Sequence, residues 1–184
     1  EGEQLRLVQE YFMTSAGLQT IIKSYLKQGL PLEKIHEKVS VHINDTHPAV
    51  APAEFMRLLV NEYRLEWDVA WDVTTKTMSY TNHTILAEAL EKWPMEYLEE
   101  VVPNLVPIIK ELDERVRKTV KDESTYIIDA QDRVHMAHMD IHYGFSVNGV
   151  AALHTEILKN SELKNFYDLY PERFNNKTNG ITFR

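Results

Sequence analysis

The chain has 184 residues, of which 43% are hydrophobic and 26% are charged, and its formal net charge is −8. A chain of this length can bury a core of its own, while its acidic balance argues against nucleic acid as a partner, since phosphate binding needs a cationic surface. The absence of cysteine excludes disulfides and thiolate zinc sites. No apolar run approaches the roughly 20 residues of a membrane-spanning helix, so we expect no membrane partner.

The first half of the sequence alternates between helical and strand-like patterns. Apolar residues recur at helical spacing over residues 4–28, and Gly29 and Pro31 end that run. Residues 39–44 alternate apolar and polar side chains, as a half-buried strand does. The same criteria predict helices at residues 32–38, 53–63 and 68–77, and a strand that runs into a polar turn at residues 78–84.

The second half is predicted to be mostly helical. Its clearest helix covers residues 105–120, where an apolar face is accompanied by i,i+4 pairs of opposite charge. Asn148 is a good candidate for the N-cap of a helix at residues 150–159. The remaining patterns predict helices at residues 87–93, 95–101 and 163–169, two paired strands at 126–129 and 133–139, an asparagine-rich loop at 175–180 and a strand at the end. One helix-rich α/β domain is the simplest interpretation.

Three polar turns carry side chains that suit the binding of a sugar. They are residues 44–48 (NDTHP), 80–84 (YTNHT) and 177–182 (KTNGIT). Each follows a predicted strand or precedes a predicted helix, and ligands of open α/β sheets bind beyond the carboxyl ends of the strands. Amides, carboxylates and neutral imidazoles pair well with hydroxyl groups, which both donate and accept. The competing interpretation of each segment is an ordinary turn or helix cap, where the same residue types are common.

A group of histidines allows a metal-site hypothesis. On a helix, His135, His138 and His142 would share one face, with Asp140 among them, whereas on a strand His135 and His138 would point to opposite faces. The surrounding pattern favours a bent strand, and no HExxH pattern is present. We therefore predict partly buried histidines that are hydrogen-bonded to the backbone, and no metal site.

Other polar positions also have two interpretations. Glu88 and Glu91 lie one turn apart on a predicted helix, either as a paired acid and base or as a solvated helix face. His42 would share a strand face with Asn44 and is predicted to be a packed strand residue. His154 is predicted to be a core or surface residue of its helix rather than a catalytic group.

Short segments along nearly the whole chain resemble, in order, motifs of the α-1,4-glucan phosphorylases, the family of glycogen and maltodextrin phosphorylases. The order of these segments is far more specific than any one of them. The segments are residues 9–12 (QEYF), 44–48 (NDTHP), 67–71 (WDVAW), 80–84 (YTNHT), 88–94 (EALEKWP), 136–138 (MAH), 147–151 (VNGVA), 154–158 (HTEIL) and 174–182 (FNNKTNGIT).

The resemblance implies an activity for the parent protein. Inorganic phosphate would remove the terminal glucose of an α-1,4-glucan as α-glucose 1-phosphate, with pyridoxal phosphate as the cofactor, in a cytoplasmic homodimer. The implied fold is the two-domain glycosyltransferase type (GT-B-like). Residues 1–184 would be one excerpt, from the later part of the N-terminal domain into the start of the C-terminal domain. We expect the excerpt alone to be inactive and to bind no cofactor, because the cofactor lysine and half of the cleft lie outside it.

The resemblance also implies roles for five residues of the polar turns. His83 resembles the family histidine that contacts the glucose 6-hydroxyl, and Thr84 is its neighbour. Asn179 resembles an asparagine that binds the same sugar. Asp45 and His47 resemble a pair that lines the pocket beside the anomeric carbon.

Two segments depart from the family pattern, and other functions stay open. Phe183 stands where proline is usual, and residues 140–145 (DIHYGF) replace a stretch that usually contains GSH. Glu88 and Glu91 would lie further from the sugar.

The alternative functions are a nucleotide-sugar glycosyltransferase of similar fold, a carbohydrate-binding or scaffold domain without chemistry, and a metal hydrolase built on His135 and His138.

Overall fold

A four-stranded parallel sheet lies at the centre of the molecule. The computed structural model describes residues 2–183, and the strands are arranged in the order β1-β2-β5-β6. Every neighbouring pair is parallel, so the carboxyl ends of all four strands meet at one edge of the sheet. The strands are β1 (Val41–Asn44), β2 (Met78–Thr81), β5 (Ser146–Gly149) and β6 (Phe174–Asn176).

The register of the sheet separates apolar from polar residues in successive rows. Ile43, Tyr80, Val147 and Phe174 lie opposite one another across the four strands, and all of them are buried. The next row consists of Asn44, Thr81, Asn148 and Asn175, and the row before consists of His42, Ser79 and Ser146. Because successive residues of a strand point to opposite faces, one face of the sheet is apolar and the other is polar.

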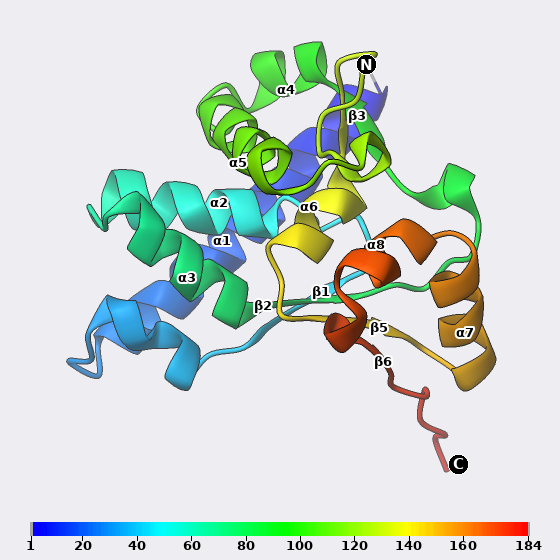
Figure 1. Cartoon of the computed structure of the whole chain (residues 1–184). Coiled ribbons are helices and arrows are strands. Elements are labelled where there is room, and N and C mark those ends of the chain that lie inside the picture. The colour runs from blue at the N-terminus through cyan, green and yellow to red at the C-terminus, as the bar shows by residue number, and fades with distance from the viewer. Residues whose placement is uncertain (1, 184) are drawn as a thin grey trace.

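Eight α-helices make up much of the rest of the described residues 2–183 and pack mainly against the apolar face. In Figure 1, α6 and α8 lie above the middle of the sheet and α7 lies beside β5 and β6. Within residues 2–183 none of the helices is long and apolar enough to cross a membrane. The helices are α1 (Gly2–Leu26), α2 (Ala51–Arg57), α3 (Trp67–Thr77), α4 (Met95–Val101), α5 (Val106–Thr119), α6 (Met136–His142), α7 (Ala152–Asn160) and α8 (Lys164–Leu169).

Short elements complete the connections. A π-helical turn (Leu58–Glu62) extends α2, and 3₁₀ turns occupy Leu32–Glu37, Ala87–Ala89, Glu123–Thr125 and Pro171–Arg173. A separate antiparallel pair joins β3 (Lys92–Pro94) to β4 (Arg133–His135). The crossovers from β1 to β2, β2 to β5 and β5 to β6 all contain helices, as parallel strands require.

A buried carboxylate fastens α1 to α2. Glu54 is fully buried and accepts hydrogen bonds from Tyr11 Oη and Ser15 Oγ, both at 2.9 Å. Arg57 adds two bonds, from Nε at 2.9 Å and Nη2 at 2.6 Å. A buried charge is tolerated when it is paired and fully hydrogen-bonded, and both oxygens of Glu54 satisfy that condition.

The structure confirms the helix-rich α/β class with a parallel sheet, and it corrects several elements. Residues 87–93 are not one helix, because a 3₁₀ turn ends at Ala89 and Trp93 belongs to β3. The predicted strand 133–139 ends at His135 and continues as α6. The predicted pairing with 126–129 is reduced to a single antiparallel bridge between Ile128 and Val134. The apolar residues at 134, 136, 137, 139 and 141 fit a strand that continues as a short buried helix. A run this short does not distinguish a buried strand from a buried helix.

Two further predictions fail near the C-terminus. Asn148 is not a helix cap, because β5 includes it and Ala151 is the residue before α7. The expected strand after Gly180 is absent as far as residue 183, where residues 177–183 have no regular secondary structure. Residue 184, also part of that prediction, lies outside the described residues.

Candidate functional site

The polar face of the sheet opens into a groove of about 620 Å³ at its carboxyl edge. Strand residues form its floor, and the segments after β2, β5 and β6 form its rim. Of the predicted sugar-binding residues, His83 and Asn179 both line it. The remaining lining residues are His42, Asn44, Ser79, Thr81, Phe145, Ser146, Asn148, Val150, Asn175, Lys177, Thr178 and Gly180.

The ring of His83 is held at the rim by the neighbouring strand. Its Nε2 lies 2.5 Å from Oδ1 of Asn44, the last residue of β1. An amide oxygen only accepts, so in the neutral ring Nε2 carries the proton and Nδ1 remains an acceptor. The backbone before it is fixed as well, because Asn82 N donates to Asn148 O at 2.9 Å. The exposed imidazole therefore offers an oriented acceptor beside the groove.

Asn179 reaches the same groove through a chain segment that is hydrogen-bonded to the end of β5. Lys177 N donates to Gly149 O at 3.1 Å, and Asn179 N donates to Val150 O at 3.0 Å. These backbone bonds leave the Asn179 side chain exposed at the rim. Its amide supplies both a donor and an acceptor, which is the combination that a sugar hydroxyl needs.

The structure places the other predicted residues near this edge but not all in one groove. Asp45 follows β1 with a positive φ of 67°, and its Oδ1 accepts from Thr46 N at 2.8 Å, so its carboxylate forms a local turn. Thr84 is half-buried beside His83, and its Oγ1 accepts from Leu86 N at 3.0 Å. His47 lines a different groove of about 390 Å³. His83 and Asn179 are thus brought together, whereas Asp45, Thr84 and His47 do not line their groove.

Sequence reasoning missed most of the groove floor. Asn148 accepts from Thr81 Oγ1 at 2.8 Å, and Asn175 Nδ2 donates to Ser146 Oγ at 2.7 Å, so the polar face is linked across three strands. The signal was present as the alternation of polar residues within each strand. Parallel strands are usually apolar on both faces, which makes a polar alternation in them informative.

A second groove of about 360 Å³ contains the two carboxylates that the sequence allows either as a paired acid and base or as a solvated helix face. Glu88 and Glu91 both line it, but the close partner of Glu91 comes from α1. Arg6 donates from Nη2 to Glu91 Oε1 at 2.5 Å and from Nε to Glu10 Oε1 at 2.9 Å. Burial raises the pKa of Glu10 to about 7, against the effect of Arg6 and with a further contribution from Glu91. The paired carboxylates are therefore Glu10 and Glu91, joined by Arg6.

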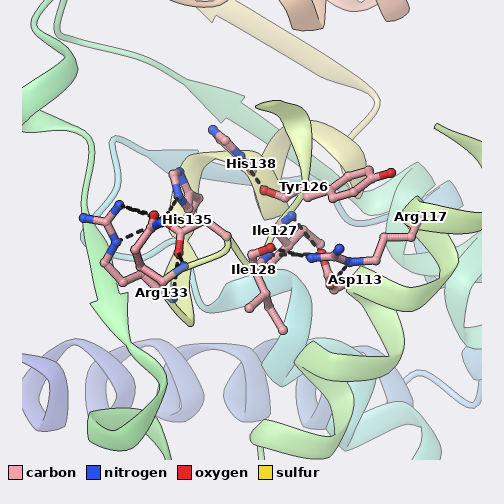
Figure 2. Close-up of polar contacts among 10 residues, drawn as sticks. Asp113, Arg117, Tyr126, Ile127, Ile128, Arg133, His135 and His138 are labelled. Atoms are coloured by element: carbon pink, nitrogen blue, oxygen red, sulfur yellow. Dashed lines mark hydrogen bonds and ion pairs between the residues drawn. The ribbon is translucent and has the colours of Figure 1, made fainter. Parts of the chain in front are cut away.

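The histidines of β4 and α6 act as structural links. His138 Nδ1 donates to Tyr126 O at 2.8 Å, and His135 Nε2 lies 2.8 Å from Asp129 Oδ2, as Figure 2 shows. Their rings are not on opposite faces, as a strand would place them, but stack with centroids 4.3 Å apart. Burial and the neighbouring His135 lower the pKa of His138 to about 3. Within residues 2–183 no group of three or more histidine, cysteine or acidic residues is arranged to hold a metal ion.

Hydrogen bonds fix the loop that precedes these histidines. Asp113 Oδ1 accepts from the backbone nitrogens of Ile127 and Ile128, at 3.0 and 3.1 Å. Arg117 closes the arrangement, with Nε 2.5 Å from Asp113 Oδ2 and Nη2 2.6 Å from Ile128 O. Figure 2 shows these contacts as one continuous network. The network accounts for the polar residues of this region without a ligand.

The segment 140–145, which departs from the family pattern, fills the core with polar side chains. Burial lowers the pKa of His142 to about 4, and its ring bonds Tyr170 Oη and Thr125 O, both at 2.8 Å. Tyr143 Oη donates to Leu112 O at 2.6 Å. Asp140 is fully buried, and burial raises its pKa well above the ordinary value. Tyr143 therefore contacts α5 and His142 contacts the segments around Thr125 and Tyr170, whereas Phe145, the last residue of the segment, is 46% exposed and lines the first groove.

The sequence relationships agree with the geometry of the sheet edge. The model of the family described as carbohydrate phosphorylase matches residues 1–184. The chain belongs to the carbohydrate phosphorylase family. It is 61% identical over 184 residues to a maltodextrin phosphorylase of Streptococcus pneumoniae and 46% identical over 192 residues to a glycogen phosphorylase of Bacillus subtilis. The muscle form of glycogen phosphorylase from Bos taurus is 43% identical over 203 residues.

The carbohydrate phosphorylase match covers all of this chain but only part of each relative. In each of these three alignments 100% of the chain corresponds to 24% of the relative. The chain therefore spans about a quarter of the length of the curated relatives it matches. The groove at the carboxyl edge is formed from residues within that quarter.

Proposed function

We propose that this chain supplies the glucose-binding side of the active-site cleft in an α-1,4-glucan phosphorylase. The observation that carries the proposal is the convergence of His83 and Asn179 on one groove at the carboxyl edge of a parallel sheet. These two residues are far apart in the sequence, and each is held there by bonds to a neighbouring strand or to the segment after it. Relatives named maltodextrin phosphorylase and glycogen phosphorylase add support.

The chemistry of the groove suits a neutral polyol. Among its described lining residues are four asparagines, two histidines and several hydroxyl groups, with Lys177 as the one charged side chain. Lys177 Nζ donates to Asn175 Oδ1 at 2.5 Å and keeps its charge, so this single exposed cation is the only charged group that the described lining offers to a ligand. A site that pairs each hydroxyl with an oriented donor or acceptor also rejects analogues that lack the hydroxyl.

In the parent, His83 and Asn179 would hold the terminal glucose while inorganic phosphate displaces the rest of the glucan at the anomeric carbon. The bond between the anomeric carbon and the glucan oxygen breaks and a bond to a phosphate oxygen forms, while the proton that phosphate loses goes to the departing glucan oxygen, giving glucose 1-phosphate. Fixed hydrogen bonds around the sugar stabilise the oxocarbenium-like transition state by several kcal/mol in general. We further propose that Asp45 and His47 lie beside the anomeric carbon of the bound glucose and that Thr84 acts as the neighbour of His83, although none of the three lines the groove of His83 and Asn179 in this chain.

The proposal extends to the architecture of the parent. A parallel sheet with a groove at its carboxyl edge supports a two-domain, GT-B-like fold. In that fold, residues 1–184 would form the later part of the N-terminal domain and lead into the C-terminal domain. A homodimeric parent is part of the same proposal.

Pyridoxal phosphate would be bound elsewhere in the parent. The described lining residues of this groove include no arginine, and their lysine is hydrogen-bonded to Asn175. These residues do not fit a phosphorylated aldehyde cofactor, so we derive no step of the reaction through it. The contribution of this chain is to bind and orient the sugar.

The test is an assay of the full-length parent for glucose 1-phosphate release from maltodextrin, with and without inorganic phosphate. We expect release to require phosphate and to fall by at least about 100-fold in His83→Ala, the size of effect that a lost positioning contact can have. His36→Ala is the matched control, since His36 lies in the 3₁₀ turn Leu32–Glu37 and does not line the groove. Release that is independent of phosphate, or equal losses in both variants, would contradict the proposal.

A further inference from the structure

His154 links the rim segment that carries His83 to Val150, the residue whose backbone oxygen holds Asn179, although it does not line the groove itself. It lies in the first turn of α7 and is half-buried. Its Nδ1 lies 3.1 Å from Val150 N, and its Nε2 lies 3.1 Å from Thr84 O. One side chain therefore joins the segment after β2 to the segment after β5.

The partners of the ring define its protonation state. Val150 N is a backbone donor, so Nδ1 of His154 must accept and carries no proton. Thr84 O is a backbone acceptor, so Nε2 must donate. A neutral imidazole has one donor and one acceptor, and here both are used. The ring thus acts as a bridge of fixed length between two backbone positions.

Each end of the bridge lies next to a residue that we propose contacts the sugar, through a peptide bond at one end and a backbone hydrogen bond at the other. Thr84 follows His83 directly, and its backbone nitrogen is held by Asn82 Oδ1 at 2.9 Å. At the other end, Val150 O accepts the backbone bond from Asn179 N at 3.0 Å. The same residue, Val150, is therefore fixed at its nitrogen by His154 and fixes Asn179 by its oxygen.

Gly149 provides the space for this arrangement. A Cβ at position 149 would lie 2.9 Å from His154 Nδ1 and 2.4 Å from Thr155 Oγ1. Any side chain there would push the start of α7 away from the end of β5. The close approach that lets His154 reach Val150 N is therefore built into the backbone.

We propose that His154 is a positioning residue for the sugar site, which sets the separation between His83 and Asn179 across the groove. This inference rests on the proposed function of the groove. It predicts that the bridge matters for substrate binding and turnover even though the ring touches no substrate. A misplacement of about 1 Å can cost on the order of 100-fold in rate when the displaced groups orient a substrate.

Three substitutions in the full-length parent separate the two halves of the bridge. His154→Phe keeps a ring and removes both bonds. In His154→Asn the amide oxygen can replace Nδ1 toward Val150, and in His154→Gln the amide nitrogen can replace Nε2 toward Thr84. Leu153→Ala is the matched control on the same turn, because Leu153 is 74% exposed.

The readouts are kcat and KM for maltodextrin, the melting temperature, and amide hydrogen exchange of residues 83–86 and 149–151. We expect His154→Phe to lower kcat/KM by about 10-fold to 100-fold, with faster exchange in both segments. His154→Asn should restore protection at Val150 only, His154→Gln should restore it near Thr84 only, and each should recover part of kcat/KM.

Two results would overturn the inference. The first is wild-type kcat/KM and exchange in His154→Phe, as in Leu153→Ala. The second is an equal loss of kcat/KM in all three variants together with a lowered melting temperature, which would make His154 merely structural. A wild-type parent with no phosphate-dependent release would instead refute the proposed function, and the exchange measurements would still test the bridge.

Discussion

Two adjacent rows of side chains on the same four strands differ in character. The apolar row consists of Ile43, Tyr80, Val147 and Phe174, and the polar row consists of the next residue of each strand: Asn44, Thr81, Asn148 and Asn175. The first row is covered by helices and the second lines the groove. Parallel sheets usually bury both faces and are apolar on both. The difference between the two rows shows that each short strand contributes both to the core and to the lining of the groove.

Polar groups also differ between the helix-covered side of the sheet and the groove. On the helical side, buried polar groups such as Glu54 and Asp113 are held by several hydrogen bonds. At the groove, His83 and Asn179 are exposed and keep unused hydrogen-bonding capacity on their side chains. Substitutions on the helical side should therefore cost stability, whereas substitutions at the groove rim should cost binding.

The largest stability effect is expected at Glu54. Glu54→Ala would leave Arg57, whose side chain is 13% exposed, without its buried partner, and loss of one member of a buried pair typically costs about 3–5 kcal/mol. Glu62→Ala is the control, because Glu62 bonds the same arginine at 3.3 Å from a 58% exposed position and should cost under about 1 kcal/mol. Urea unfolding of both variants measures the difference. Similar losses would show that burial does not determine the strength of these two contacts.

The next prediction compares the stability cost of substituting two neighbouring residues of β1 that point to opposite faces of the sheet. Ile43 is 1% exposed, and Ile43→Ala should lower the free energy of unfolding by about 2–5 kcal/mol through lost burial and the cavity left behind. His42 is exposed on the polar face, and His42→Ala should stay within about 0.5 kcal/mol of wild type. Denaturant midpoints at constant m-value provide the test. A comparable loss of unfolding free energy in His42→Ala would mean that the polar face also stabilises the fold.

A pH effect is expected from His138, a histidine of α6. Burial lowers the pKa of His138 to about 3, while an unfolded histidine titrates near about 6.5. Between those values the unfolded chain binds a proton that the folded chain does not, so His138 contributes stability above pH 6.5 that is lost as the pH falls. The slope is at most about 1.4 kcal/mol per pH unit for this one group.

His138→Asn isolates that contribution, because the asparagine amide can still donate to Tyr126 O as Nδ1 does. The free energy of unfolding, measured between pH 7 and pH 4, should fall less steeply in the variant than in wild type. Titrating groups that do not interact with His138, such as Glu10 with its pKa of about 7, contribute equally to both proteins and cancel in the difference. Parallel curves for the two proteins would show that His138 titrates alike in the folded and unfolded states.

The sequence alone predicts the parts of this molecule whose signals are local. The helix at 105–120 and the strands at 39–44 and 78–84 have strong periodicity, and the structure confirms them within a few residues. The polar turns were expected at strand ends, and His83 and Asn179 indeed share a groove there. By contrast, Asn148 was misread as a helix cap because a polar residue on the open face of a strand has the same local pattern as a cap.

Long-range contacts were beyond the reach of local patterns. The link from His154 to Thr84 joins residues in different crossovers, and no spacing in the sequence indicates it. The same is true of Arg6, which joins Glu10 to Glu91. Short apolar runs such as 134–141 were also ambiguous, since a buried strand and a buried helix look alike over so few residues.

The smallest effect concerns the hydrogen bond that links β2 to β5 on the polar face. Thr81 Oγ1 donates to Asn148 Oδ1 at 2.8 Å, and Asn148 is 9% exposed. A neutral hydrogen bond of this kind contributes about 1 kcal/mol, so a double-mutant cycle of Thr81→Val and Asn148→Ala should give a coupling energy near that value. A coupling near zero would mean that water replaces the partner at no cost and that the polar row consists of independent side chains. A coupling of the expected size would show that the side chains of the polar row stabilise one another across the strands, as those of the apolar row do.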